Sequence, residues 1–141
     1  YNSAQLRKES KDALDALINV LIENPNVVVQ LRSHTDNRAG DDFNMELSQR
    51  RAQICVDYMV AKGIEPMRLI AIGMGENEPF VMDVKDGKLK LGILLDNKFI
   101  EKLKRKKKRE KAHQYNRRTD FKVVLDSFYD SESDRVLPNK K

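Results

Sequence analysis

The stretch RSHTDNRAGDDFNMELSQRRAQICVDYM, residues 32–59, decides the fold because a polar loop runs directly into a long amphipathic helix. We expect this helix to extend from about Asn44 to Lys62 and to end at Gly63, since glycine commonly terminates helices. Its apolar side collects Leu47, Ile54, Cys55, Tyr58 and Met59. Arg51 falls on the same side, and a guanidinium removed from water requires an anionic partner. The pattern therefore predicts an anion close to Arg51.

The positive charge of the chain is concentrated in one segment. Residues 102–111 hold eight cations and one anion, which exceeds the net charge of +5 and leaves the rest of the chain negative. A nucleic-acid-binding protein carries its cations across a face or along a groove. We therefore expect no nucleic-acid partner. A solvated helix face or loop is the default interpretation of the block, and contact with anionic lipid, glycan phosphate or a partner protein is the alternative.

Several functional classes are disfavoured by composition. The single cysteine, Cys55, excludes an internal disulfide and any site built from several cysteines, and its place on the apolar side predicts a buried thiol. No run approaches the roughly 18 apolar residues of a membrane-spanning helix. The chain begins at Tyr1 without a signal peptide, so we expect a piece of a longer parent chain that carries other domains.

The remaining elements follow from local patterns. Leu14, Leu17, Ile18 and Leu21 recur at helical spacing before Pro25 and predict a helix. Strands are expected at residues 26–32, 67–73 and 119–128, where β-branched or alternating apolar residues gather. Between them we expect a loop at 33–43, a turn at 74–79, irregular structure at 81–98, and a helical segment from about 97 through the basic block to about 118. These elements predict an α+β domain with helices on one face of a small mixed sheet.

The motifs in this chain carry a family likeness. They are His-Thr-Asp at 34–36, Asn-x-x-Leu-Ser-x-Arg-Arg-Ala at 44–52, Gly-Ile at 63–64, Arg-Leu at 68–69, Gly-x-Gly-Glu-x-x-Pro at 73–79, and Asn-Arg-Arg at 116–118. Together they resemble the OmpA-like peptidoglycan-binding domains, in a version similar to those of Bacteroidota. The resemblance implies a βαβαβ-β two-layer sandwich over residues 1–128, followed by a polar tail at 129–141.

Three departures from the family pattern stand out. Ser33 replaces the usual glycine, and residues 84–112 form a longer and more basic insertion than compact members have. The first strand is expected to be truncated, because Tyr1 and Asn2 correspond to its end. Whether that strand is supplied by upstream sequence stays open.

The resemblance also implies a ligand, the meso-diaminopimelate residue of the peptidoglycan stem peptide. Asp36 resembles the aspartate that takes the ammonium group, and Arg51 resembles the arginine that grips the carboxylate. Supporting polar residues and the pocket wall correspond to Asn44, Arg117, Thr35 and Leu47. Asp36 and Arg51 are expected to pair with each other in the empty site. No catalytic residue, metal or cofactor is implied.

The expected role is non-catalytic anchoring of an outer-membrane or periplasmic protein or assembly to the cell wall, which implies a periplasmic, outer-membrane-associated location. The main alternative is a protein-interaction domain of an envelope machine, such as the type IX secretion or gliding apparatus, that binds a partner through the basic insertion. A purely structural Arg51 is a further alternative. An enzyme is disfavoured because His34 and His113 have no nucleophile or metal set beside them. The Gly-x-Gly at 73–75 lacks the third glycine or lysine of a nucleotide site.

Overall fold

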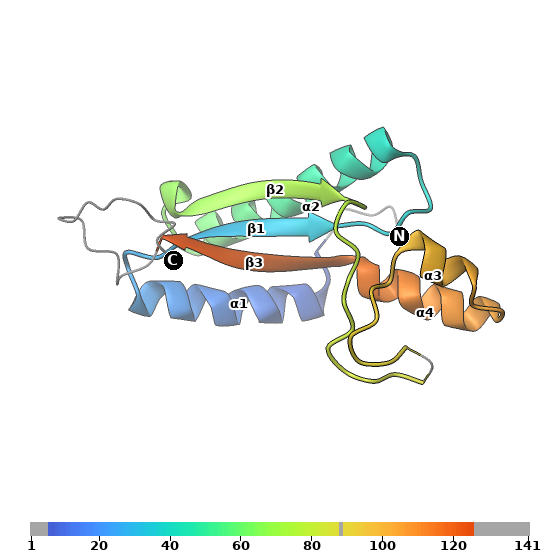
Figure 1. Ribbon diagram of the computed structural model, residues 1–141. Coiled ribbons are helices and arrows are strands. Elements are labelled where there is room, and N and C mark those ends of the chain that lie inside the picture. The colour runs from blue at the N-terminus through green and yellow to red at the C-terminus, as the bar shows by residue number, and fades with distance from the viewer. Residues whose placement is uncertain (1–5, 88, 126–141) are drawn as a thin grey trace.

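The structure, a computed structural model, describes residues 6–87 and 89–125, and its centre is a three-stranded sheet (Figure 1). The strands are β1 (Val28–His34), β2 (Leu69–Gly75) and β3 (Arg118–Leu125). They lie in the order β2-β1-β3, with β2 parallel and β3 antiparallel to β1. The small mixed sheet of the predicted α+β class is therefore confirmed.

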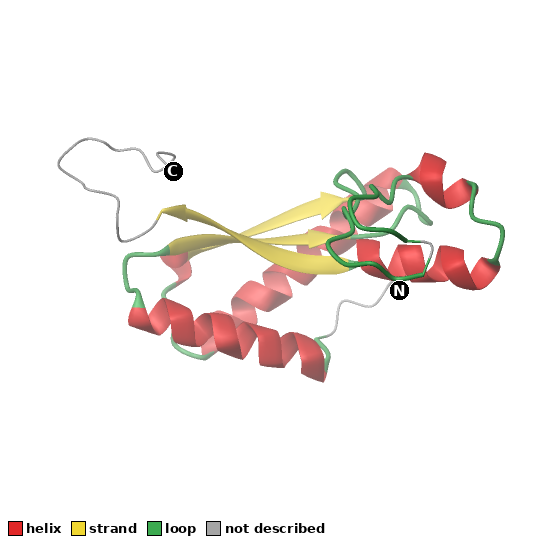
Figure 2. Cartoon of the chain, turned by 60° about the horizontal axis from the view of Figure 1, so that its bottom comes forward, coloured by secondary structure: helices red, strands yellow, loops and turns green. Residues whose placement is uncertain are grey.

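Two helices cover one face of this sheet (Figure 2). They are α1 (Lys8–Glu23) and α2 (Asp41–Ala61). The main core forms between helices and sheet because each helix turns an apolar stripe toward the strands. Its buried residues include Leu14, Leu17, Ile18 and Leu21 from α1, Val29 and Leu31 from β1, and Cys55, Val56 and Met59 from α2. The predicted α1 stripe and the buried thiol are both confirmed.

The helix that holds Arg51 begins earlier than expected. α2 starts at Asp41 rather than Asn44, so two aspartates lie in its first turn, where the helix dipole favours negative charge. Its end agrees with the prediction: Lys62 is the C-cap, and Gly63 follows with φ of 108°. Arg51 is half-buried on the side that also holds Ser48, Ala52 and Cys55. The placement of an arginine within the buried stripe is thus confirmed.

The turn expected at residues 74–79 begins later than predicted, because β2 continues through Gly75. Gly73 is required by packing rather than by a turn. A Cβ atom at this position would lie 2.4 Å from the backbone nitrogen of Gln49 and 2.6 Å from Ser48 Oγ. The absence of a side chain therefore lets α2 approach β2 closely.

A buried arginine lies at the end of the sheet where β2 begins. Arg68, at the end of a short 3-10 helix (Pro66–Arg68), is 8% exposed. Its guanidinium donates hydrogen bonds of 2.7, 2.8 and 3.0 Å to the backbone oxygens of Leu21, Asn24 and Val27. These carbonyl groups lie at the end of α1 and in the loop after it, where helix carbonyls lack partners within the helix.

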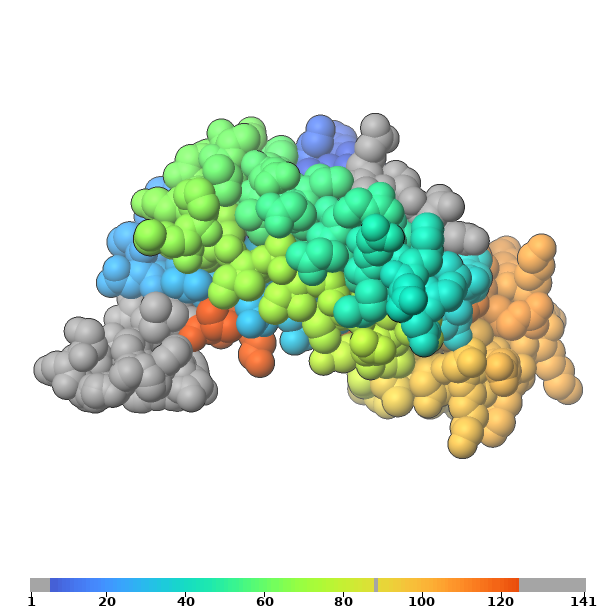
Figure 3. Space-filling model, turned by 90° about the horizontal axis from the view of Figure 1, so that it is seen from above, coloured from blue at the N-terminus to red at the C-terminus, as the bar shows by residue number. Residues whose placement is uncertain are grey.

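The basic segment belongs to a folded insertion at one end of the molecule (Figure 3). Isolated bridges pair Val81 with Leu94 and Asp86 with Leu89. α3 (Asn97–Glu101) and α4 (Lys106–Asn116) follow, so the single helical segment expected here is wrong. A second core holds Met82, Leu89, Leu95, Ile100 and Ala112.

Two kinds of contact accompany the break between α3 and α4. Leu103 turns inward and packs against the second core, while the backbone oxygens of Leu103 and Lys104 accept hydrogen bonds from Arg109. Asp96 caps the start of α3 by accepting a 2.9 Å hydrogen bond from the Phe99 backbone nitrogen. The cationic run therefore includes a structural turn and does not form one continuous helix.

Some expectations fall outside the part of the chain that the structure describes. The truncated first strand, the last residues of the 119–128 strand and the polar tail lie wholly or partly at positions 1–5 and 126–141. The proposed domain limits therefore stay predictions. Across the described ranges, no helix is both long and apolar enough to cross a bilayer.

Candidate functional site

The site is centred on Asp36, which follows β1 and is 4% exposed. Its Oδ2 atom lies 2.8 Å from a guanidinium nitrogen of Arg38 and 2.8 Å from one of Arg117. Its Oδ1 atom accepts a 3.0 Å hydrogen bond from the Arg38 backbone nitrogen. A nearly buried carboxylate is thus held by two cations and one amide.

The ionisation of Asp36 reflects these contacts. Burial by itself raises the pKa of a carboxyl group, because the charged form loses its hydration. The hydrogen bonds from Arg38 and Arg117 outweigh this effect and lower the pKa of Asp36 to about 2. The group is therefore an anion at every physiological pH, as an acceptor for a ligand ammonium must be.

Glu110 of the insertion joins the same network. Its Oε1 atom lies 2.8 Å from Arg38 Nη1, and its Oε2 atom lies 3.3 Å from Arg117 Nη2. Arg117 is the C-cap residue of α4. Its ion pairs with Asp36 and Glu110 therefore also fix the end of this helix. Two carboxylates and two guanidinium groups alternate, and α4 of the insertion supplies one carboxylate of this network.

Arg51 approaches the network from α2. Burial lowers the pKa of Arg51, the positive charges of Arg117 and Arg7 lower it further, and the negative charge of Asp36 opposes them. Arginine nevertheless remains charged in proteins. The Asp36 carboxylate forms ion pairs with Arg38 and Arg117. The expected pairing of Asp36 with Arg51 stays a prediction.

A cavity of about 890 Å³ adjoins the arginines, between the first half of α1, α2 and β3. Arg51 and Arg117 both line it, and so do the apolar residues Leu14, Leu31 and Phe121. The wall also holds the acids Glu9 and Asp120, so it carries both signs of charge beside an apolar part.

The other predicted site residues support the loop that holds Asp36. Asn44, 3% exposed, donates 3.0 Å hydrogen bonds to the Ala39 oxygen and to Glu76 Oε1. It therefore ties the Asp36 loop to the turn after β2. Leu47 is a buried residue of α2, with 2% of its surface exposed. Thr35 is anchored by its backbone nitrogen, 2.8 Å from the Gly75 oxygen, and its buried Oγ1 atom has no hydrogen-bond partner among the described residues.

His34 is the last residue of β1 and makes a structural contact there. Its Nε2 atom lies 3.0 Å from Asp120 Oδ2 on the neighbouring strand β3. Burial and the nearby Arg118 lower the pKa of His34 below its ordinary value. The imidazole is therefore neutral near pH 7, packed between strands.

Sequence reasoning missed three residues of the site: Arg38, Glu110 and His113. The first lies in a polar loop with no periodicity, and the other two lie on a helix whose position depends on the insertion. His113 is 9% exposed, and the charges of Arg38, Asp36 and Glu110 all act on its pKa, which burial lowers. The one usable signal was Glu110 itself, the single anion within the basic run.

Comparison with known proteins shows which family this chain matches in sequence. The family described as the OmpA family matches residues 1–89. "Outer membrane protein A" of Escherichia fergusonii is 36% identical over 98 residues, which are 68% of this chain and 40% of that protein. The chain therefore corresponds to less than half the length of that relative.

Solved structures show the same fold at lower identity. The peptidoglycan-associated lipoprotein of Burkholderia pseudomallei aligns with a TM-score of 0.63 at 17% identity, covering 87% of this chain and 84% of that one. The cell wall anchor of the type VI secretion system (T6SS) of Pseudomonas aeruginosa aligns with a TM-score of 0.57 at 24% identity, covering 86% and 71%. With the family match over more than half of its residues, this chain belongs to the OmpA family.

Proposed function

We propose that this domain binds peptidoglycan non-covalently through the meso-diaminopimelate residue of the stem peptide. The observation that carries the proposal is the nearly buried Asp36 anion, with Arg117 against it and Arg51 on the adjoining helix. Diaminopimelate in a stem peptide presents an ammonium and a carboxylate on one carbon. A site with both signs of charge, shielded from water, suits that zwitterion because charge-assisted hydrogen bonds are strong there.

The assignment of roles follows from charge. Asp36 accepts from the ligand ammonium, and Arg51 donates to the ligand carboxylate through its planar fork. Arg117 holds the Asp36 carboxylate in place by the 2.8 Å contact. Asn44 fixes the loop through its bonds to Ala39 and Glu76, while Leu47 and Thr35 support the wall.

Binding of this kind would anchor a larger protein or assembly to the cell wall. Two proteins of similar fold are named a peptidoglycan-associated lipoprotein and a cell wall anchor, which supports such a role here. We propose that the domain is non-catalytic, uses no cofactor, and works in the periplasm in association with the outer membrane.

Calorimetric titration of two muropeptides tests the ligand. We expect a diaminopimelate peptide to bind more tightly than a lysine peptide, because lysine keeps the amine and lacks the far-end carboxylate. Loss of charge-assisted hydrogen bonds to Arg51 is worth about 1.5–3 kcal/mol, roughly ten- to a hundredfold in affinity. Arg51→Ala should erase most of this preference.

Arg50→Ala is the matched control, because it removes the same charge from the exposed side of α2. It should keep the preference for diaminopimelate. Equal affinities of the wild-type protein for both peptides would return Arg51 to a structural role and reject the proposed ligand.

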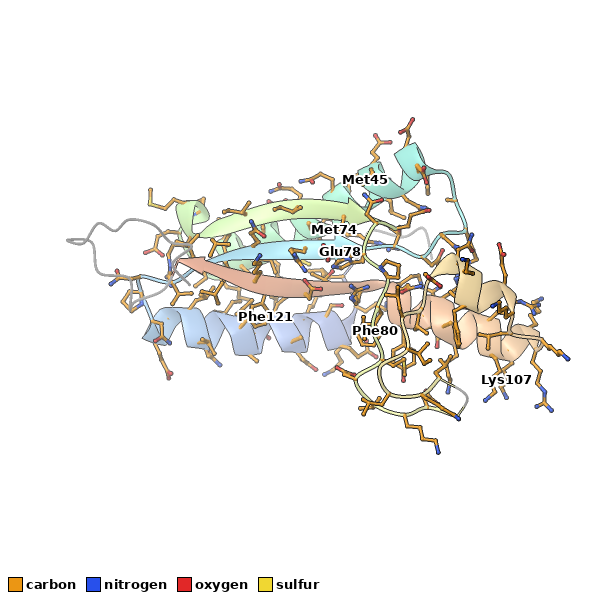
Figure 4. The ribbon with its side chains drawn as sticks, in the orientation of Figure 1. Met45, Met74, Glu78, Phe80, Lys107 and Phe121 are labelled. Atoms are coloured by element: carbon orange, nitrogen blue, oxygen red, sulfur yellow. The ribbon has the colours of Figure 1, made fainter. Side chains whose placement is uncertain are left out.

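A second candidate function is protein binding through the insertion, in an envelope machine such as a secretion or gliding apparatus. The supporting observation is the group of exposed cations around the α3–α4 turn, where Lys107 points away from the sheet (Figure 4). Capture of a defined protein from an envelope extract should then be lost when Lys104, Lys106 and Lys107 become Gln, and kept in Arg51→Ala. Capture that ignores the lysines would reject this candidate.

A further inference from the structure

We infer that Arg38 occupies the position at Asp36 Oδ2 that a ligand ammonium would take, so that a cationic ligand must displace Arg38 to reach this oxygen. Arg38 is thereby a specificity-determining residue that sets the affinity for the ligand's amine. This inference rests on the proposed function, because it concerns the same ligand group.

The hydrogen-bond acceptor positions of the Asp36 carboxylate support this inference. A carboxylate has about four lone-pair positions, two on each oxygen. Oδ2 of Asp36 already accepts from Arg38 Nη2 and Arg117 Nη1, both at 2.8 Å, and Oδ1 accepts from the Arg38 backbone nitrogen at 3.0 Å. One position therefore remains for an incoming ammonium, which has three donors. A close ion pair at Oδ2 requires that one guanidinium withdraws.

Arg38 is the guanidinium that can withdraw. It lies in the loop between β1 and α2, and its side chain is 29% exposed. Arg117 is 16% exposed and is held at both ends, by its backbone as the C-cap of α4 and by its guanidinium between Asp36 and Glu110. Withdrawal of Arg38 would move the side chain of a loop residue, whereas movement of Arg117 would disturb a helix end.

Glu110 gives Arg38 a second carboxylate to hold. Arg38 Nη1 lies 2.8 Å from Glu110 Oε1, so the guanidinium bridges the two acids. After displacement from Asp36, Arg38 can keep this contact and remain paired. Glu110 is therefore a positioning residue for Arg38. Through Glu110, the insertion influences the proposed peptidoglycan-binding site.

The competition can be measured by removing the competitor. We expect Arg38→Ala to raise the affinity for a stem tripeptide ending in meso-diaminopimelate by about tenfold, the worth of a charge-assisted contact. Arg38→Gln, which keeps most of the side chain without its charge, should give a similar gain. Arg105→Ala removes an equal charge from the exposed turn of the insertion and should change nothing.

A second ligand makes the test specific for the amine. With the amino terminus of both tripeptides blocked, acetylation of the far-end amine leaves no ammonium, so the acetylated tripeptide does not compete with Arg38. Arg38→Ala should leave its weak binding unchanged. Thermal melts of each variant establish that the compared proteins are folded.

The outcomes distinguish a failure of the inference about Arg38 from a failure of the proposed function. If the wild-type protein binds the tripeptide and Arg38→Ala binds it equally or more weakly, Arg38 is a bystander or a ligand contact, and the inference fails alone. A gain that also appears with the acetylated peptide would likewise reject it. If neither protein binds the tripeptide, the proposed function fails as well.

Discussion

The carboxylate of Asp36 is nearly buried, so its ion pairs support the folded state as well as any ligand contact. Removing it to alanine would leave Arg38 and Arg117 without one of their partners, and uncompensated charge in a partly desolvated site is destabilising. Asparagine keeps the shape and one acceptor oxygen. Asp36→Asn is therefore the better variant for separating binding from folding.

Asp36→Asn should change how stability depends on pH. The folded pKa of about 2 lies below the ordinary value of 3.8, so the ionised group stabilises the protein above pH 4 and loses this effect as pH falls toward 2. A shift of this size is worth roughly 2 kcal/mol. Urea unfolding of both proteins at about pH 6, 4 and 3 should show a gap that narrows with acid. A constant gap would mean that the ion pairs do not depress the pKa.

Residue-scale prediction from sequence succeeded where a side chain lies on a regular element or in a specific motif. The half-burial of Arg51 follows from helical periodicity, and the closeness of Asp36 to Arg117 follows from the motif resemblance. Arg38 was missed because it lies in a polar loop without periodicity, although Asp36 is only two residues away. Glu110 was missed because its contacts depend on where the insertion folds back against the loop, which no local pattern encodes.

Among the elements, α2 and β2 pack tightly against each other at Gly73. We expect Gly73→Ala to destabilise the protein by about 1–3 kcal/mol, as overpacking in a core does. The added Cβ would lie 2.4 Å from the Gln49 nitrogen and would disturb the 2.8 Å hydrogen bond from the Gly73 nitrogen to Gln49 Oε1. Chemical denaturation measures the loss.

Gly40→Ala is the control for this prediction. Gly40 has φ of −68° and no atom within 4 Å of an added Cβ, so alanine fits there. Alanine is a poorer N-cap than glycine, but it lowers the conformational entropy of the unfolded chain. Because these effects oppose each other, the net change should be below about 1 kcal/mol. Equal effects at both positions would show that α2 and β2 separate easily.

The attachment of the insertion depends on Asn116. Its Oδ1 atom accepts from the Phe80 nitrogen at 2.8 Å, and its Nδ2 atom donates to the Leu95 oxygen at 3.0 Å. Asn116→Ala should cost about 1–3 kcal/mol for each buried backbone group left without a partner. Hydrogen exchange should accelerate at Phe80, while exposed Gln114→Ala should leave it unchanged. Slow exchange in both variants would contradict this role.

The elements themselves were largely predictable. α1, α2 and the three strands follow from hydrophobic period and from Gly63, because burial against a sheet requires that period. The split into α3 and α4 was not predictable, since eight cations obscure the few apolar residues that form the second core. Inward-facing Leu103 decides that turn through tertiary packing.

At the scale of the whole molecule, the exposed cations are concentrated on the insertion that holds the second core. We expect replacement of residues 104–108 by Ser and Gln to leave binding to purified sacculi nearly unchanged at about 0.15 M salt, because exposed charges are screened there. Co-sedimentation with sacculi measures this, with Arg51→Ala as the variant that loses binding. A severalfold loss in the 104–108 variant would mean that the basic turn contacts the wall directly.

The position of Arg68 has a consequence for the order of folding. α1 precedes the sheet in the chain, yet hydrogen bonds from a residue 41 to 47 positions away satisfy the carbonyl groups at its end and in the following loop. An isolated α1 keeps the local hydrogen bonds at its end but lacks the three from Arg68, which form only when the start of β2 lies beside α1 and β1. We therefore expect the end of α1 and the start of β2 to open as one cooperative unit.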